Sequence, residues 1–393
     1  MKVLLADRVL AGSDLATIDH GAVILDGDPI VWVGREADLS ADQYDVDADV
    51  QWLGDVTLMP GLIDAHVHLA FDGGPTPVKR MMAENDAQQV ALMLRSAREL
   101  LSVGVTTARD LGARGYLDIA VRDAIADGTT RGPRMLTAGP ASTVTGGHCW
   151  FMGAEVDSVA EMRQMVRRHH KAGVDVIKLM STGGNMTPGS APWHAQFTTE
   201  ELRVAVDEAH RLNKLVAAHA HGTEGIRRAL EAGVDTLEHC SFQTPDGIGA
   251  VDPELADRIA AAEVYVSPTC NFRMSEFRVL MPDRQFAVGE LYRRGAKIIA
   301  STDSGIDHPP TTGTSEGSSR SPSSGFRPRR CLPRRPPAPP QRSASPTRPD
   351  SSPRGSLPTS SPWGETRAAT SRRCTTCAWS CPRAFRSHRT CCR

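Results

Sequence analysis

Short apolar runs alternate with longer amphipathic stretches from about residue 58 to residue 303. The runs have the length and composition of buried strands, and the stretches between them have the periodicity of helices. The expected strands are residues 58–68, 106–110, 134–138, 174–180, 215–219, 236–239, 264–269 and 297–303. Eight strands that alternate with helices over about 245 residues are typical of a (β/α)8 TIM barrel, an α/β fold.

Signals at the helix ends support this prediction. Ser158, with Glu161 three positions later, and Thr198, with Glu201, have the spacing of helix N-caps. Several helices run into Ala-Gly-Val or Val-Gly-Val, in which glycine ends a helix before a parallel strand. The expected helices include residues 87–102, 158–172, 199–212, 223–232 and 253–262.

Residues 1–57 have a different pattern, with short β runs at 2–5, 22–25 and 30–33 and turn signals such as Asp26-Gly27-Asp28-Pro29 between them. This predicts a small all-β piece, the N-terminal part of a β-sandwich subdomain. It is too short to close a sandwich alone, so we expect it to be incomplete without strands from elsewhere.

The formal net charge of −1 sums two unlike regions. Residues 309–393 contain 16 Arg, no Lys and three acids, which gives +13 and leaves −14 for residues 1–308. They also contain 15 Pro and 16 Ser but no Val, Ile or Met, so this segment cannot bury a core and we expect a disordered tail. The predicted domains are therefore 1–57, 58–308 and the tail 309–393.

The sequence also limits location and partners. The N-terminus lacks the apolar core of a signal peptide, and no stretch reaches the roughly 18 apolar residues of a membrane span. Residues 1–308 hold only Cys149, Cys240 and Cys270, too few for a disulfide framework. We expect a cytoplasmic protein that acts on a small-molecule substrate, without nucleic-acid or membrane partners. A homo-oligomer is compatible with the sequence.

Two histidines stand at the end of the first expected strand. His66 and His68 are two residues apart, so on a strand their side chains point to the same side. Such a pair suits a divalent metal of the zinc type, and two buried histidines bonded to the backbone are the alternative. The other strand ends favour the metal, because they carry Lys178, His219, His239 and Asp303. In a barrel these ends converge on one mouth, where the chemistry lies.

Lys178 is the unusual member, because an ammonium repels a metal. It fits if it is carbamylated by CO2, which makes it a carboxylate-like bridge. A binuclear centre is then expected, in which His66, His68 and Asp303 hold the first ion and His219 and His239 hold the second. Lys178 spans the two divalent metal ions, which are expected to be Zn2+. Such a pair activates a bridging water to hydroxide. Asp303 is the expected general acid–base.

The sequence resembles the amidohydrolase superfamily, in its binuclear, lysine-bridged branch. The resemblance covers about residues 1–307 and is carried by five motifs: Pro60-Gly61-Leu62-Ile63-Asp64-Ala65-His66-Val67-His68, Val176-Ile177-Lys178, Ala217-Ala218-His219-Ala220-His221-Gly222, Leu237-Glu238-His239 and Ser301-Thr302-Asp303-Ser304-Gly305. More narrowly, residues 104–112 and Thr145-Gly146-Gly147-His148 are similar to prolidase-like and imidazolonepropionase-like members.

The resemblance implies hydrolysis of a C–N amide bond, in a dipeptide or an N-acyl amino acid. It implies that His148 binds substrate or polarises its carbonyl. His221 stands where many members carry Tyr, so its substrate contact and the specificity differ. Arg109 is a candidate for a substrate carboxylate, with a salt bridge to the adjacent aspartate or another acid as the alternative. His169 and His170 lie in a charged helix and are expected to be solvated.

Two alternatives to this function stay open. One is a mononuclear deaminase or a cyclic-amide hydrolase of the imidazolonepropionase-like kind, which would not need Lys178. The other is an inactive product of a frameshifted gene, because the resemblance predicts an eighth helix and returning strands where the tail stands.

Back-translation supports a frameshift near residues 308–311. Read from the third base of the Gly355 codon, with serine as TCN, residues 355–363 permit Leu-Ala-Ala-Asp-Leu-Val-Ala-Val-Gly, which resembles a returning strand. Resequencing of the gene that returned the present frame, together with relatives that share the tail, would contradict the hypothesis. A zinc cluster at Cys374, Cys377 and Cys381 and an RNA-binding tail are less favoured, the latter because aromatic residues are not interleaved.

Overall fold

The computed structural model describes residues 1–270 and 286–306. These residues belong to two compact units, Met1–Pro60 and the described part of Gly61–Arg329. The predicted boundary after residue 57 lies close to this division. The predicted tail, residues 309–393, lies outside the described residues.

The N-terminal unit is a five-stranded sheet. Its central strand β1 (Lys2–Ala11) pairs antiparallel with β2 (Ala16–Leu25), which pairs with β3 (Ile30–Arg35). On its other edge β1 pairs in parallel with β4 (Asp49–Trp52) and β5 (Thr57–Leu58), two strands that the apolar pattern did not predict. Residues 1–60 thus supply one layer, as expected of an incomplete sandwich.

The second unit contains eight parallel strands, one for each predicted run. They are β6 (Leu62–Val67), β7 (Val105–Asp110), β8 (Arg134–Thr137), β9 (Val176–Met180), β10 (Leu215–Gly222), β11 (Thr236–Thr244), β13 (Tyr265–Ser267) and β14 (Lys297–Ile298); a short β12 (Gly247–Ile248) turns back on β11. Several differ in length from the prediction, and β14 is much shorter than residues 297–303.

The strands form two sheets, β6-β7-β8 and β9-β10-β11-β13-β14, which backbone hydrogen bonds join at both seams. At one seam Ser142 N–H donates to Lys178 O over 2.9 Å. At the other, Asp303 N–H donates to His66 O over 2.8 Å. The barrel is therefore closed, and the carboxyl ends of all eight strands point to one mouth.

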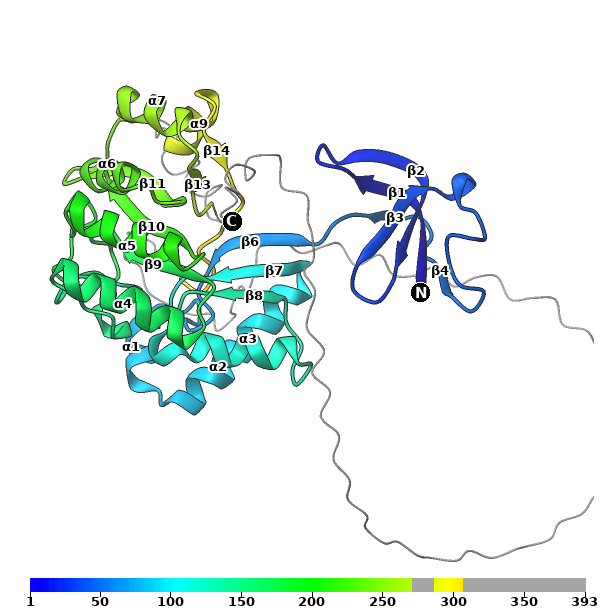
Figure 1. Ribbon diagram of the computed structural model, residues 1–393, viewed down its shortest axis with the longest axis horizontal. Helices are drawn as coiled ribbons and strands as arrows, with labels where there is room; N and C mark the ends of the chain where they lie inside the picture. The colour runs from blue at the N-terminus through cyan, green and yellow to red at the C-terminus, as the bar shows by residue number, and fades with distance from the viewer. Residues whose placement is uncertain (271–285, 307–393) are drawn as a thin grey trace, which may run out of the picture. The chain divides into compact units, whose positions relative to one another are not determined.

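Helices lie on the outer side of the strands (Figure 1). They are α1 (Pro77–Ala83), α2 (Asp86–Ser102), α3 (Leu117–Ala126), α4 (Val159–Ala172), α5 (Thr199–Arg211), α6 (Thr223–Ala232), α7 (Pro253–Ala261) and α9 (Ala287–Arg293). The predicted caps are confirmed: the Ser158 side chain accepts from Glu161 N–H, and Thr198 and Glu201 form a capping box. Gly173 ends α4 at φ 93°, a conformation that glycine adopts without strain.

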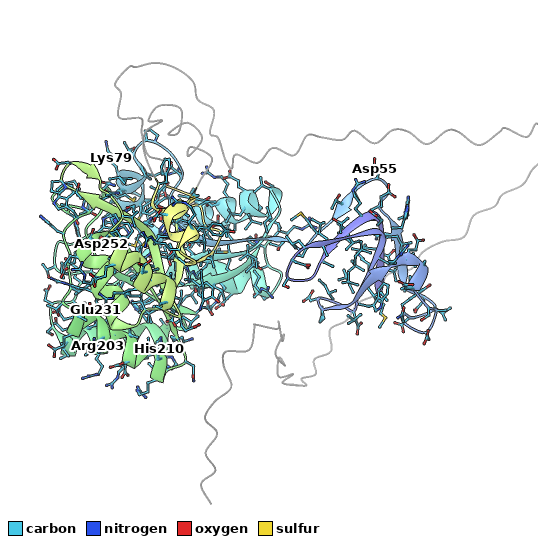
Figure 2. All side chains as sticks on the ribbon, turned by 90° about the horizontal axis from the view of Figure 1, so that it is seen from above. Asp55, Lys79, Arg203, His210, Glu231 and Asp252 are labelled. Atoms are coloured by element: carbon cyan, nitrogen blue, oxygen red, sulfur yellow. The ribbon has the colours of Figure 1, made fainter. Side chains whose placement is uncertain are left out.

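The apolar core lies between the strands and these helices, while polar side chains cover the outside. Arg203 on α5, for example, donates to Glu231 O on α6 over 3.0 Å (Figure 2). One prediction about this layer is wrong. His169 is fully buried and its Nδ1 bonds the Tyr116 hydroxyl at 2.8 Å, whereas its neighbour His170 is exposed. The buried side of α4 includes His169 because it lies one turn from the buried Met165 and Val166.

The outer wall of the barrel is bare beside β6, where the side chain of Ile63 is 59% exposed. No described helix covers it. Among the described residues, no helix is both long enough and apolar enough to cross a membrane.

The core predicts a large difference between two leucines on neighbouring strands. Leu237 on β11 is fully buried, whereas Leu215 at the start of β10 is 52% exposed. We expect Leu237→Ala to lower the free energy of unfolding by about 2–5 kcal/mol. Leu215→Ala should change it by no more than about 0.5 kcal/mol. Urea unfolding of both variants measures this, and equal losses would contradict the assigned core.

Candidate active site

The six predicted metal ligands lie together at the mouth of the barrel. His66, His68 and Lys178 are at most 5% exposed, and His219 and Asp303 are also buried. His66 and His68 stand at the end of β6, and the other four come one each from the ends of β9, β10, β11 and β14 or just after them. The barrel therefore brings together predicted ligands that are up to 237 positions apart in the sequence, from His66 to Asp303.

Three of these ligand atoms have the spacing of a metal site. The Nε2 atoms of His66 and His68 are 3.2 Å apart, and Asp303 Oδ1 is 3.4 Å from each. A tetrahedral zinc ion about 2.1 Å from its ligands sets them about 3.4 Å apart. The three atoms thus match the edges of one coordination tetrahedron.

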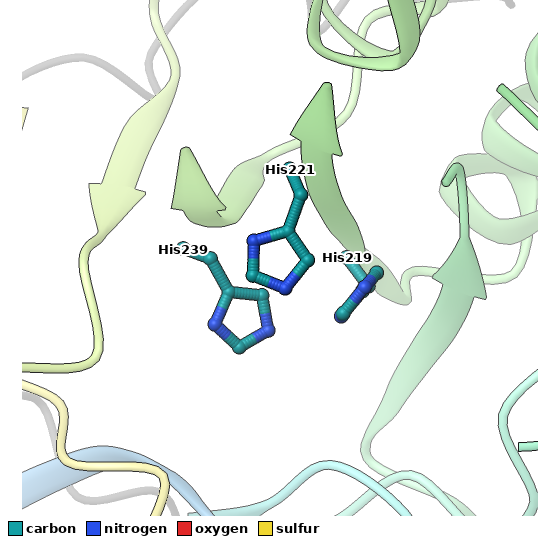
Figure 3. Close-up of side chains that lie close together, drawn as sticks. All are labelled: His219, His221 and His239. Atoms are coloured by element: carbon teal, nitrogen blue, oxygen red, sulfur yellow. The ribbon is translucent and has the colours of Figure 1, made fainter. Parts of the chain in front are cut away.

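A second group of candidate ligands lies beside the first and shares His239 with it, because ligand atoms of His66, His239 and Asp303 also lie within 4.8 Å of one another. His219, His221 and His239 offer nitrogens that lie within 4.8 Å of one another (Figure 3). The His221 and His239 rings stack with centroids 4.5 Å apart, and His219 meets both at 4.6 Å. His221, predicted as a substrate contact, is therefore also placed to serve as a ligand.

Each ligand histidine has one ring nitrogen bonded to the protein outside the cluster. Nδ1 contacts Glu238 in His66, Gly112 O in His68, Ser241 in His221 and Thr269 in His239, whereas in His219 it is Nε2 that contacts Gly183 O. The carboxylate and carbonyl partners of His66, His68 and His219 accept from the bonded nitrogen, so they set the tautomer that leaves the other nitrogen free of its proton. The hydroxyl partners of His221 and His239 can donate or accept and orient the rings without setting the tautomer. Metal-ligating histidines characteristically have such outer partners.

Lys178 is the most unusual buried group of the site. Its Nζ atom is enclosed, 1% of the residue is exposed, and no hydrogen-bond partner for it exists within the described residues. Burial lowers the pKa of Lys178 to about 8, against the pull of Glu238 and Asp303. An enclosed amine that is readily neutral and lacks a partner is suited to covalent change into a ligand.

Glu238 was not predicted as a site residue, although it stands in the Leu237-Glu238-His239 motif. Its buried carboxylate accepts from Arg109 at 2.9 Å and from Thr236 at 2.6 Å, and lies 2.8 Å from His66 Nδ1. Burial opposes its charge, but Arg109 and His66 outweigh burial and lower the pKa of Glu238 well below its usual value. Arg109 was predicted to bind either a substrate carboxylate or an acid of the protein. It forms a salt bridge with an acid, which is Glu238 and not the adjacent Asp110.

His148 lies close to the cluster, on the long loop after β8. Its ring centroid is 4.6 Å from that of His219, and a Cβ at Gly184 would lie 2.4 Å from its Nε2, so only glycine allows this approach. Burial and Lys178 lower the pKa of His148 to about 4. A neutral imidazole at this place can donate a hydrogen bond to a carbonyl oxygen.

Several residues at the mouth have a left-handed backbone that is costly without glycine. His239, Thr269 and Asp303 have φ of 65°, 52° and 59°. Such conformations cost about 1–3 kcal/mol each and concentrate at functional sites. Here they direct the side chains of His239 and Asp303, and of Thr269, which bonds His239, toward the mouth of the barrel.

Comparison with known proteins agrees with this geometry. The model of the amidohydrolase family matches residues 57–327. The chain belongs to the amidohydrolase family. The match ends at residue 327, beyond the expected frameshift site near residues 308–311. It does not test the frameshift hypothesis, which stays a prediction.

Individual relatives share at most about a third of their aligned residues with this chain in the comparisons given next. The chain is 33% identical to the ochratoxinase of Aspergillus niger over 260 residues, which are 60% of this chain and 53% of that protein. It thus spans about half the length of the curated ochratoxinases that it matches. Among solved structures, a Xaa-Pro dipeptidase is 26% identical with a TM-score of 0.67, covering 78% of this chain and 80% of the other. A prolidase complexed with N-methylphosphonate-L-proline is 27% identical with a TM-score of 0.64, covering 77% and 78%.

The buried ion pair beneath the site makes a testable prediction. Glu238→Gln leaves the Arg109 guanidinium buried without a counter-charge, so we expect the free energy of unfolding to fall by about 3–5 kcal/mol. Glu231→Gln, at the surface, should cost less than about 1 kcal/mol. The double variant Arg109→Met with Glu238→Gln should recover part of the loss in urea unfolding. A single Glu238 variant as stable as the parent would contradict the assigned role.

Proposed function

We propose that this amidohydrolase hydrolyses a C–N amide bond of a small substrate, a dipeptide or an N-acyl amino acid, with two divalent ions, Zn2+ in our assignment. His66, His68 and Asp303 would hold one ion, His219, His221 and His239 would hold the other, and Lys178, once carbamylated, would supply a further carboxylate-like ligand. The observation that carries the proposal is that two groups of candidate ligands, which share His239, lie at the same barrel mouth as the enclosed amine of Lys178, for which no hydrogen-bond partner exists within the described residues. The prolidase named among its structural relatives supports the substrate class.

Two such ions, when bound, lower the pKa of a water and polarise a carbonyl. The protein's own groups do the rest. Asp303 is positioned to take a proton from the attacking water and to pass it to the leaving nitrogen. His148, held neutral by burial, donates a hydrogen bond to the carbonyl oxygen as negative charge develops there. Glu238 keeps the His66 ring in the tautomer that presents Nε2.

A mononuclear deaminase or cyclic-amide hydrolase is the second candidate. The close spacing of His66, His68 and Asp303 would serve it by itself. The similarity to the imidazolonepropionase of Paracoccus denitrificans, which is 26% identical over 265 residues, supports the cyclic-amide hydrolase as this second candidate.

Metal content distinguishes the two candidates. We expect about two zinc ions per chain after purification with zinc and bicarbonate, as measured by mass spectrometry. Lys178→Ala should lower this to about one or none, because the bridge is lost. Lys171→Ala, on the exposed side of α4, removes a lysine elsewhere and should leave two. One ion per chain in both the parent and Lys178→Ala would instead support the mononuclear candidate. A cooperative melt must accompany each sample, since an aggregated chain would support the inactive-product alternative.

The acid–base role of Asp303 is tested separately. Asp303→Asn keeps an oxygen that can ligate but loses the proton carrier, so we expect kcat on an N-acyl amino acid to fall by about 10²–10⁴-fold. Asp207→Asn, on the exposed face of α5, is the matched control and should keep full activity. Metal content is measured on the same samples. Unchanged kcat in Asp303→Asn with both ions bound would remove Asp303 from this role.

A further inference from the structure

The backbone N–H groups of His148 and Cys149 both donate to side chains of a different loop. His148 N–H donates to Oε1 of Gln196 over 2.7 Å, and Cys149 N–H donates to Oγ1 of Thr187 over 2.9 Å. Gln196 and Thr187 both lie between β9 and α5, in the loop that follows the next strand of the barrel. His148 is thus held from outside its own loop at two consecutive peptide groups.

Both ends of the Gln196 side-chain amide form hydrogen bonds. While Oε1 accepts from His148, Nε2 donates to Met180 O over 2.8 Å and to Thr143 Oγ1 over 3.0 Å. A backbone N–H can only donate and a carbonyl oxygen can only accept, so these partners fix the direction in which the amide points. A glutamine offers an acceptor and a donor together, whereas an ionised glutamate offers acceptors alone.

Gln196 is itself fixed by the start of α5. The next residue, Phe197, is 1% exposed, its carbonyl oxygen accepts from Arg228 over 2.9 Å, and Thr198 begins the helix with a capping box. The backbone N–H of Gln196 donates to Ser181 O over 2.9 Å, directly after β9. The side chain of Gln196 therefore ties the loop of His148 to a barrel strand and to a helix.

The backbone beside His148 needs such support. Cys149 has φ of 58°, a left-handed conformation that costs free energy in a residue other than glycine. The two loops also approach closely, because a Cβ on Gly147 would lie 2.6 Å from Gln196 Oε1 and one on Gly184 would lie 2.4 Å from His148 Cε1. The ring of His148 is enclosed between them, with 4% of the residue exposed.

The position of this ring matters for the proposed chemistry. A hydrogen-bond donor stabilises a developing oxyanion only when it points to the place that the oxygen will occupy, so a displaced imidazole loses its effect. The ring centroids of His148 and His219 are 4.6 Å apart, so a shift of the loop also changes the distance of His148 from the candidate ligands.

We propose that Gln196 and Thr187 are positioning residues of the active site, which hold the backbone of His148 so that its imidazole meets the carbonyl oxygen of the substrate. The proposal rests on the proposed function, because it assigns how one group of that site is held. Both residues act through His148, so their effect on catalysis disappears when the imidazole is absent.

The first test is a double-mutant cycle on the full-length, zinc-loaded protein. Gln196→Met keeps the length of the side chain and removes its hydrogen bonds. We expect kcat on an N-acyl amino acid to fall by about 10- to 100-fold, with KM changed by less than about threefold. In a His148→Ala background, the same substitution should lower kcat by less than about twofold. A loss from Gln196→Met that is as large in this background as in the parent would overturn the proposal, because a merely structural role does not depend on the imidazole.

Gln164→Met, at an exposed glutamine of α4, is the matched control and should leave kcat unchanged. Thr187→Val removes one hydroxyl and keeps the shape of the side chain, so it carries the test if Gln196→Met does not fold. We expect it to lower kcat by about two- to tenfold, and to do so only where His148 is present. Each variant must keep the cooperative melt and the zinc content of the parent. Equal losses from Thr187→Val with and without His148 would overturn the proposal.

Hydrogen exchange followed by mass spectrometry separates this proposal from the proposed function. Peptides that contain the N–H groups of His148 and Cys149 should exchange about tenfold faster in Gln196→Met than in the parent, and Gln164→Met should not change them. Faster exchange in a protein whose parent hydrolyses no N-acyl amino acid would uphold the positioning contacts and overturn the proposed function. An active parent whose exchange and kcat are unchanged by Gln196→Met would uphold the proposed function and overturn this proposal.

Discussion

Burial of ionisable groups at one end of the barrel is the constraint on which the rest of the site depends. The side chains of one cluster at this end are buried, and each charge left unpaired there costs several kcal/mol. They are His66, His68, Lys178, His219, Glu238 and Asp303. The buried charge of Glu238 is compensated within the interior, because its carboxylate pairs with Arg109 and His66. The Nζ atom of Lys178 has no hydrogen-bond partner among the described residues, so it is the one buried charge-bearing group of the site that the interior leaves uncompensated in this way.

The barrel supplies the precision that this cluster needs. His219 on β10 is in register with Glu238 on β11, and Ala217 with Lys178 on β9, so these inward-facing positions are set by the hydrogen-bonded ladder. The outer partners of the histidines come from the same strand ends and from the loops after them. A few strained residues complete the arrangement, and the surrounding ladders hold them in place.

The two units of the chain contribute differently to function. All candidate ligands lie in the barrel unit, whereas residues 1–60 form a sheet with exposed Ile30, Val31 and Trp52. Apolar side chains on a sheet of one layer require a cover. Ile63 on the barrel wall is exposed in the same way. Within the described residues, the candidate ligands are therefore all in place, whereas part of the apolar outer surface has no cover.

The sequence by itself determined the strand order, most helix ends and which candidate ligand residues stand at the strand ends, because these follow from local periodicity, capping and the convergence of parallel strand ends. The tertiary structure decided what depends on contacts between distant segments. Glu238 and His239 are adjacent, so a regular strand would turn them to opposite sides, yet φ of 65° at His239 breaks the alternation and both serve the site. The Arg109 partner and the burial of His169 were likewise decided by neighbours 129 and 53 positions away, which no local pattern encodes.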